Sequence, residues 1–223
     1  MSSRRRCLAA LAWTACMPLA WAGAWEDFFQ AIELDDERTV ADLLRRGFDP
    51  NARDARRQPA VVVALFKDSR KVAAVLLASR KLKVEARNAK DESPLMMAAL
   101  RGNLAAARTL IARDADINKT GWTPLHYAAS SGADDAPAMV ALLLEHSAYI
   151  DAASPNGTTP LMMAAQYGKI DVARLLLREG ADPTLKNQQG LTALDFARKA
   201  ERDGLARDII RAMQGQRPNK GQW

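Results

Sequence analysis

Apolar residues recur along this chain in short runs that are separated by glycines and polar turns. In residues 157–186, two such runs lie on either side of Gly168: GTTPLMMAAQYGKIDVARLLLREGADPTLK. The apolar positions in each run follow the three-to-four-residue spacing of a helix that buries one face. The pattern therefore predicts two short helices followed by a turn-rich segment.

The ends of these two helices carry their own signals. Thr159 is a capping residue, and Pro160 is tolerated in the first turn of a helix. We expect Gly168 to end the first helix in a left-handed conformation and Gly180 to stop the second. Residues 182–190 then predict an extended hairpin.

The same unit occurs six times. The aligned positions advance by 32, 35, 30, 36 and 33 residues, at Asp27, Pro59, Pro94, Pro124, Pro160 and Ala193. The step of 30 indicates that the hairpin near residues 118–121 has lost about three residues, and the step of 36 indicates a gain of about three at residues 133–137. Since neither helix of a unit can bury its apolar face alone, neighbouring units must stack.

The motifs resemble those of ankyrin-repeat proteins: TPLHYAA at 123–129, TPLMMAA at 159–165, SPLMMAA at 93–99 and REGADPT at 178–184. The resemblance implies a mainly α fold, an ankyrin-repeat α-solenoid with β-hairpin loops. We expect it to span residues 23–213 and a polar tail to follow at 214–223. The predicted repeats lie near 25–57, 58–90, 91–120, 121–156, 157–189 and 190–213.

The first 22 residues have the pattern of a secretory signal peptide, with arginines at 4–6, an apolar stretch and small residues at its end. We expect cleavage after Ala22, with Ala24 as the second choice. A membrane anchor is the alternative, although the apolar stretch is short for a bilayer span. Twin-arginine export and lipidation at Cys16 also stay open. The chain is thus expected in the periplasm of a bacterium, or secreted.

Removal of this segment changes the chemistry of the chain. The net charge of +6 falls to +3, because residues 1–22 hold three arginines and no acid, and such a balance does not indicate nucleic-acid binding. Cys7 and Cys16 are lost with it. Of the two histidines, His126 stands in TPLH, where the resemblance implies a hydrogen bond between neighbouring loops, and His146 ends a helix. We therefore expect no catalytic, cofactor or metal site, and no later membrane span.

Three groups of side chains suggest other chemistry but have simpler interpretations. The methionine pairs 96–97 and 162–163 lie in first helices, where packing is favoured over a soft-metal site. Asp134 and Asp135 are interpreted as solvated loop charges. A solvated face is also favoured over an anion site for the basic group Arg53, Arg56, Arg57, Lys67 and Arg70.

The resemblance implies a concave face made of hairpin tips and first helices, on which a partner protein binds. Exposed Trp, Tyr and Arg often dominate binding energies. For Trp122, local packing over the shortened hairpin is an alternative role. By position, the candidate binding residues are Lys90, Glu92, Leu100, Arg101, Lys119, Thr120, Trp122, Ser130, Ser131, Gln166, Tyr167, Gln188 and Gln189.

The sequence thus favours a non-enzymatic, monomeric module that binds another protein. Two alternatives stay open. One is an enzyme with a site built from carboxylates and arginine, and the other is a structural protein tethered to the membrane.

Overall fold

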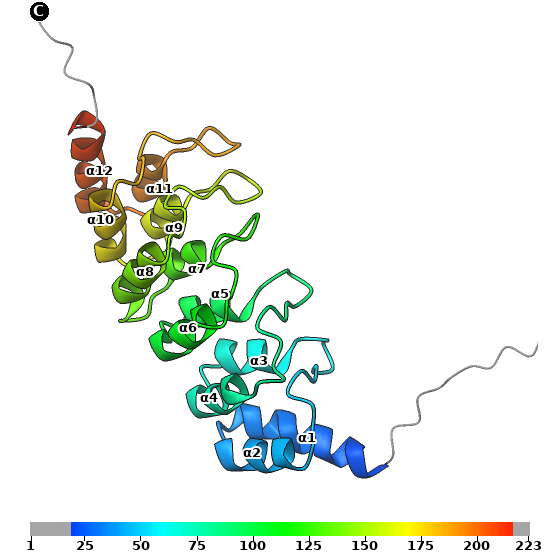
Figure 1. The fold of residues 1–223 in the computed structure, drawn as a ribbon. Helices are drawn as coiled ribbons and strands as arrows, with labels where there is room; N and C mark the ends of the chain where they lie inside the picture. Colours follow the sequence, from blue (N-terminus) through cyan, green and yellow to red (C-terminus); the bar gives the residue numbers. More distant parts are fainter. Residues whose placement is uncertain (1–18, 216–223) are drawn as a thin grey trace, which may run out of the picture.

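The computed structural model describes residues 19–215, which form twelve helices arranged as six pairs (Figure 1). Each pair contributes a first and a second helix to the stack. The pairs are α1 (Leu19–Glu33) with α2 (Glu37–Arg45), α3 (Ala60–Phe66) with α4 (Arg70–Ala78), α5 (Pro94–Leu100) with α6 (Leu104–Ile111), α7 (Pro124–Ser130) with α8 (Ala136–Glu145), α9 (Pro160–Gln166) with α10 (Ile170–Arg178), and α11 (Ala193–Lys199) with α12 (Asp203–Gly215).

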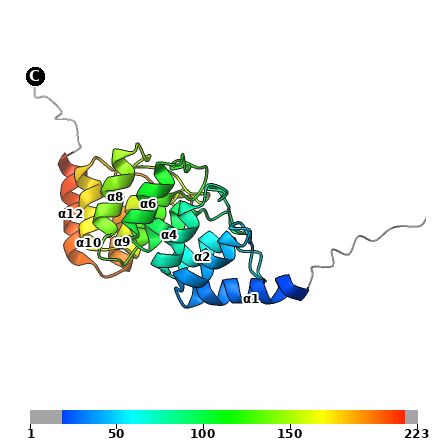
Figure 2. The same ribbon diagram turned by 60° about the horizontal axis from the view of Figure 1, so that its bottom comes forward.

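The helices form two layers. First helices pack against first helices, as α5 does against α3 and α7, and the second helices lie side by side in a row of their own (Figure 2). Leu125 and Leu161 are fully buried in consecutive first helices, as are the paired alanines that follow them at 128–129 and 164–165. Small alanines let the first helices approach closely, so each repeat buries the face that its neighbour exposes. The predicted mainly α solenoid is confirmed.

Most first helices begin with a side-chain cap. The Thr159 hydroxyl accepts a hydrogen bond from the Met162 amide, as predicted, and Ser93, Thr123 and Thr192 make the equivalent bond in their repeats. Such a cap satisfies an amide that has no partner inside the helix.

Gly168 serves a different purpose from the one predicted. It does not adopt a left-handed conformation, whereas Gly180 does, with a φ of 97°. A Cβ atom on Gly168 would lie 2.0 Å from the Ala129 carbonyl oxygen and 3.0 Å from the Ala164 Cα. Glycine is therefore required here because two repeats meet backbone to backbone.

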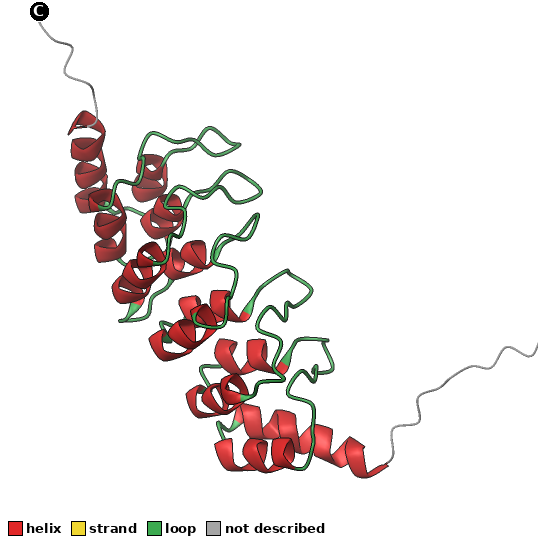
Figure 3. Ribbon diagram, viewed as in Figure 1, coloured by secondary structure: helices red, strands yellow, loops and turns green. Residues whose placement is uncertain are grey.

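The connections between repeats fold back on themselves, but the predicted β-hairpin character is wrong for the described residues. They contain no strand (Figure 3). An isolated antiparallel bridge joins Arg53 to Pro59. Four of the loops are closed instead by a hydrogen bond from the amide of one residue to the carbonyl four residues later: Asp54 to Gln58, Asn88 to Glu92, Ser154 to Thr158 and Asn187 to Leu191. A pair of strands would need a longer ladder of such bonds.

The first and last helices are the longest of the described part of the chain, and the predicted domain boundaries stay a prediction. Helix α1 begins at Leu19, before the expected cleavage point, and α12 continues to Gly215, two residues into the predicted tail. Residues 1–18 and 216–223 lie outside the described part of the chain, so the signal-peptide prediction falls mostly there. Within the described part, no helix has the length and apolar character needed to cross a bilayer.

Candidate finger-face binding site

Five loops, here called fingers, project from the side of the stack that carries the first helices (Figure 1). Fingers 1, 2, 4 and 5 comprise residues 49–58, 83–92, 149–158 and 182–191, and finger 3 is the shorter segment 116–122. The fingers and the first helices together make the surface that we call the finger face. The predicted binding residues were placed on this surface.

Each finger is tied to the next by a side chain that accepts a hydrogen bond from the first amide of the following finger. The donors and acceptors are Lys83 N to Asn51 Oδ1 at 2.7 Å, Asp116 N to Glu85 Oε1 at 2.9 Å, Tyr149 N to Asn118 Oδ1 at 2.8 Å and Asp182 N to Asp151 Oδ1 at 3.1 Å. This repeated bond holds the fingers in register, so the face is built before any partner arrives.

Finger 3 has lost the residues that close the other loops, and Lys119 fills the space. The Lys119 side chain is 4% exposed and its Nζ lies 2.6 Å from Asp91 Oδ2 on finger 2. Its Nζ also donates to the carbonyl oxygens of Thr120, at 3.0 Å, and Trp122, at 3.3 Å. The hydrogen bond from Lys119 is the main reason that the pKa of Asp91 is lowered. The prediction that Lys119 is exposed to a partner is therefore wrong, because its ammonium group takes the place of the missing loop.

His126 links two repeats, as the motif implied. Its ring is fully buried, with Nδ1 2.8 Å from the Thr123 hydroxyl and Nε2 2.9 Å from the Thr158 carbonyl oxygen. Burial lowers the pKa of this histidine, against the opposing effect of hydrogen bonds to backbone groups at Thr158 and Ala152. The imidazole is thus held neutral as a bridge between finger 4 and the start of α7.

A surface pocket of about 230 Å³ opens beside this histidine, and we call it the apolar pocket. Its lining comes from three first helices and finger 3: Leu100, Trp122, His126, Tyr127, Ser130 and Met163. The Tyr127 hydroxyl donates to Glu92 Oε1 at 2.9 Å, so finger 2 supports one wall. Burial, and then the bond to Glu92, raise the pKa of Tyr127, which leaves its hydroxyl protonated as a donor.

Both roles considered for Trp122 have support. The indole is half-buried and meets the His126 ring edge to face, with ring centroids 5.2 Å apart. It also lines the apolar pocket. Trp122 therefore packs locally and also lines the pocket.

Most other predicted residues are accessible on the finger face. Tyr167 is the C-cap residue that follows α9 and is 64% exposed. Leu100 and Ser130 line the apolar pocket, and Glu92 is half-buried between Tyr127 and Asn88. The predicted residues that are exposed on the fingers are Lys90, Thr120, Gln188 and Gln189, of which Gln188 donates to the Pro155 carbonyl oxygen at 2.8 Å.

Ser131 and Gln166 depart from the expectation of free polar groups. Ser131 is 1% exposed, and its hydroxyl donates to the Leu100 carbonyl oxygen at 2.6 Å, so it is a bridge between repeats and the prediction of its exposure is wrong. The Gln166 side chain is half-buried, and its Oε1 has no hydrogen-bond partner among the described residues.

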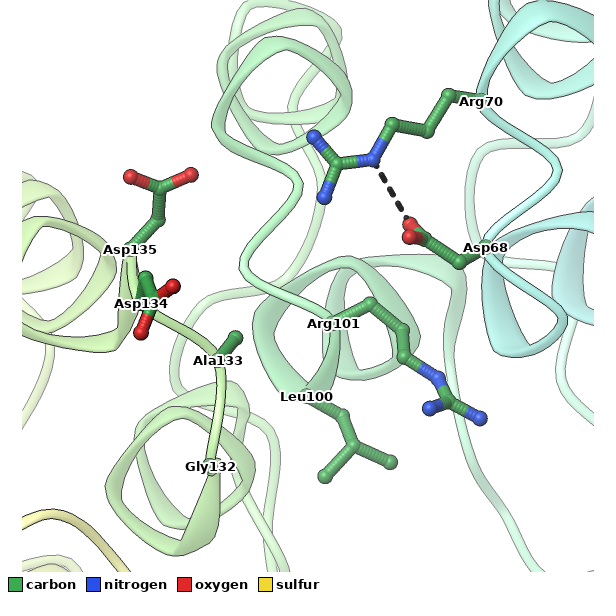
Figure 4. A pocket seen from close by; sticks show the side chains of 8 residues that line it. All are labelled: Asp68, Arg70, Leu100, Arg101, Gly132, Ala133, Asp134 and Asp135. Carbon is green, nitrogen blue, oxygen red and sulfur yellow. Dashed lines mark hydrogen bonds and ion pairs between the residues drawn. The ribbon is translucent and has the colours of Figure 1, made fainter.

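Arg101 lies in a second hollow, of about 580 Å³, near the turns that join first and second helices (Figure 4). The enlarged turn at 132–135 forms one wall. Arg101 packs over the Phe66 ring at 5.0 Å and donates to the Phe66 carbonyl oxygen at 2.7 Å. Arg70 pairs with Asp68 at 2.9 Å, and Asp134 pairs with Lys169. Of the charged residues that line the hollow, Asp68 and Arg70 thus pair with each other, whereas Asp134 pairs with a lysine outside the lining.

Tyr127 and Met163 line the apolar pocket but were not among the predicted binding residues. Both stand four residues after the capping threonine of their helix, at the position that Met97 fills in the preceding repeat. Met97 is 1% exposed, whereas Tyr127 and Met163 are half-buried. A bulky apolar residue at this position was the available signal, and its degree of exposure depends on the neighbouring finger.

The predicted methionine packing is confirmed for Met96, Met97 and Met162, each of which is 1% exposed. Within residues 19–215, no three His, Cys, Asp or Glu side chains gather where they could hold a metal ion. The expectation of no cofactor stays a prediction.

A family model described as ankyrin repeats in three copies matches residues 28–120, 74–154, 117–187 and 137–220. The chain is 30% identical over 167 residues to the nuclear factor NF-kappa-B p105 subunit of Gallus gallus, covering 72% of this chain and 17% of that protein. It is 32% identical over 192 residues to the B-cell lymphoma 3 protein homolog of Mus musculus, covering 81% and 42%. It is also 30% identical over 176 residues to the human SH3 and multiple ankyrin repeat domains protein 2, covering 77% and 9%. The chain spans less than half the length of each of these relatives.

Proposed function

Because this chain belongs to the ankyrin-repeat family, whose repeats indicate a protein–protein interaction module, we propose that its finger face holds a partner protein and performs no catalysis. The observation that carries this proposal is the apolar pocket. Four of its lining residues, Leu100, Trp122, Tyr127 and Met163, are half-buried and apolar or aromatic. Side chains of this kind in a hollow are typical of the anchor sites of protein interfaces.

The energetics favour a binding role for this surface. Transfer of one large apolar side chain of a partner into such a pocket contributes about 1.5 to 3 kcal/mol. Because the fingers are tied together and the first helices are packed, little further ordering is needed when a partner binds. Tyr167 is a further exposed aromatic side chain, in the repeat that contributes Met163 to the pocket.

We further propose that the protein works in the periplasm of a bacterium, or is secreted, after cleavage near Ala22. The support is the residue pattern of the first 22 residues alone. The mass of the protein recovered from the envelope fraction tests this. A mass that corresponds to a chain beginning at Gly23 or Trp25 supports export. An uncut chain found in the cytosol contradicts it.

Site-specific cross-linking in the source cells tests the binding face. A photoreactive phenylalanine analogue replaces Tyr167, on the finger face, and in a matched variant replaces Thr109, which is exposed on α6 among the second helices. We expect a cross-linked product with a second protein from position 167 and none from position 109. Products from position 109 alone would place the partner on the second helices. No product from either position would contradict the proposal that the chain binds a partner protein.

A further inference from the structure

The charges of the fingers are unevenly distributed along the stack. Fingers 1 and 2, with the turn before finger 2, carry Arg53, Arg56, Arg57, Arg80, Lys81, Lys83, Arg87 and Lys90 against Asp49, Asp54, Glu85, Asp91 and Glu92. Fingers 4 and 5, with the turn before finger 5, carry one cation, Lys186, against Asp151, Glu179 and Asp182. The surplus positive charge of the finger face therefore lies at its N-terminal end.

Most of the acidic groups at that end are already engaged. Asp91 is held by Lys119 and Arg87, and Asp54 accepts the amides of Arg56 and Gln58 in the turn of finger 1. The cations at the tips are in a different position. Arg56, Arg57 and Lys90 are exposed, and none of their side chains takes part in an ion pair or side-chain hydrogen bond within the described residues. They are free to meet charges from outside.

Fingers 1 and 2 act as one surface because Arg53 joins them. Its Nη1 donates to the Arg57 carbonyl oxygen at 2.6 Å and to the Arg87 carbonyl oxygen at 3.2 Å. The group of basic residues seen in the sequence is divided by the fold, since Lys67 pairs with Glu33 at 2.7 Å and Arg70 pairs with Asp68, both at the turns between helices. Lys90, on finger 2, is a further exposed cation at this end of the face.

Finger 2 contacts a wall of the apolar pocket. Glu92, two residues after Lys90, accepts the hydroxyl of Tyr127, which lines the pocket. A partner segment that crosses fingers 1 and 2 would therefore reach the pocket directly.

Resting on the binding role proposed above, we infer that the partner presents an acidic polypeptide segment to Arg56, Arg57 and Lys90, with a bulky apolar residue that enters the apolar pocket. A carboxylate suits the fork of an arginine side chain. A single-stranded nucleic acid fits less well, because the tips of fingers 1 and 2 have no aromatic side chain on which bases could stack.

Selection of a displayed random-peptide library on the purified chain tests this inference. We expect the enriched peptides to be more acidic than the input library and to contain a large apolar residue. Their affinity is then measured on a charge-reversal variant, Arg56→Glu/Arg57→Glu/Lys90→Glu. The control, Arg108→Glu/Arg178→Glu/Arg207→Glu, makes the same change of charge at exposed, unpaired arginines of the second helices.

The expected result is binding that is at least about tenfold weaker for the finger variant and little changed for the control, with the difference shrinking as salt is raised. Enrichment of neutral or basic peptides, no enrichment, or equal losses in both variants would overturn the inference. A single-stranded oligonucleotide that binds the same tips more tightly than the peptides would overturn it in favour of a nucleic acid. Neutral peptides that bind the finger face, or a cross-link at position 167, would leave the proposed binding function standing while the acidic-partner inference fails. The failure of the inference can therefore be distinguished from a failure of the proposed function.

Discussion

Gly168 marks the place where two repeats come into backbone contact. Any side chain there would meet the Ala129 carbonyl oxygen, whereas a Cβ on Gly132 would meet nothing within 4 Å, and neither glycine has a positive φ. We expect Gly168→Ala to lower the free energy of unfolding by about 1 to 3 kcal/mol through overpacking. Gly132→Ala, the matched control, should change it little. Denaturant unfolding of both variants decides the matter, and equal stabilities would show that the contact is relaxed in solution.

His126 makes stability depend on pH near neutrality. Since burial lowers its pKa in the folded state, the unfolded chain takes up a proton first as pH falls below about 6.5, the ordinary histidine pKa. Stability should therefore be full above that pH and fall as pH drops towards the folded-state pKa, by at most about 1.4 kcal/mol per pH unit.

Unfolding measured between about pH 7.5 and pH 5.5, above the ordinary carboxylate range, tests the role of this histidine. His126→Gln should flatten the dependence, while His146→Gln, at an exposed helix end, should preserve it. A slope unchanged by His126→Gln would assign the effect to other groups.

For single residues, the sequence could predict hydrogen bonds that belong to a short motif. The Thr159 cap depends on a motif a few residues long, and the His126 bridge to a carbonyl 32 residues away was implied by the resemblance of TPLH to the family motif. The burial of Ser131 could not be read in this way, because its hydroxyl bonds to a carbonyl 31 residues earlier. The role of Gly168 likewise depends on a neighbouring repeat.

At the scale of elements, finger 3 shows how a shortened loop is stabilised. The change in repeat spacing predicted the shortening, but only the packing of finger 2 against it shows that Asp91 receives the Lys119 ammonium group. An amphipathic residue at a loop tip is ordinarily exposed, so the sequence favoured a surface role. The apolar pocket could not be predicted either, because its lining comes from three helices and finger 3, which are brought together only by the fold.

Replacement of Lys119 tests this account of finger 3. We expect Lys119→Met to lower the free energy of unfolding by about 1 to 3 kcal/mol, because two carbonyl groups lose their donor. Lys90→Met, on the exposed tip of finger 2, should change it by less than about 0.5 kcal/mol. Thermal or denaturant unfolding measures both changes. An unchanged free energy of unfolding for Lys119→Met would mean that the hydrogen bonds of the lysine contribute nothing to stability.

On the scale of the whole molecule, a stack of repeats has stability that is distributed along its length. Ile209 is fully buried in α12 at one end, and Leu143 is fully buried in α8 near the middle. Either change to Ala should cost about 2 to 5 kcal/mol locally. We expect Ile209→Ala to speed amide hydrogen exchange mainly in α11 and α12, and Leu143→Ala to speed it on both sides of α8. Uniform acceleration by Ile209→Ala would contradict the repeat-by-repeat picture.

The central claim is that the finger face, and the apolar pocket within it, binds the partner. The most direct test uses the partner protein that is cross-linked through position 167. Its affinity is measured for two variants, Met163→Gln and Ile170→Gln, each of which changes an apolar residue to glutamine. Met163 lines the pocket, and Ile170 is 39% exposed at the start of α10 in the other layer. We predict at least about tenfold weaker binding for Met163→Gln and unchanged binding for Ile170→Gln, with both variants folded by circular dichroism. Equal affinities, or a loss confined to Ile170→Gln, would contradict the account.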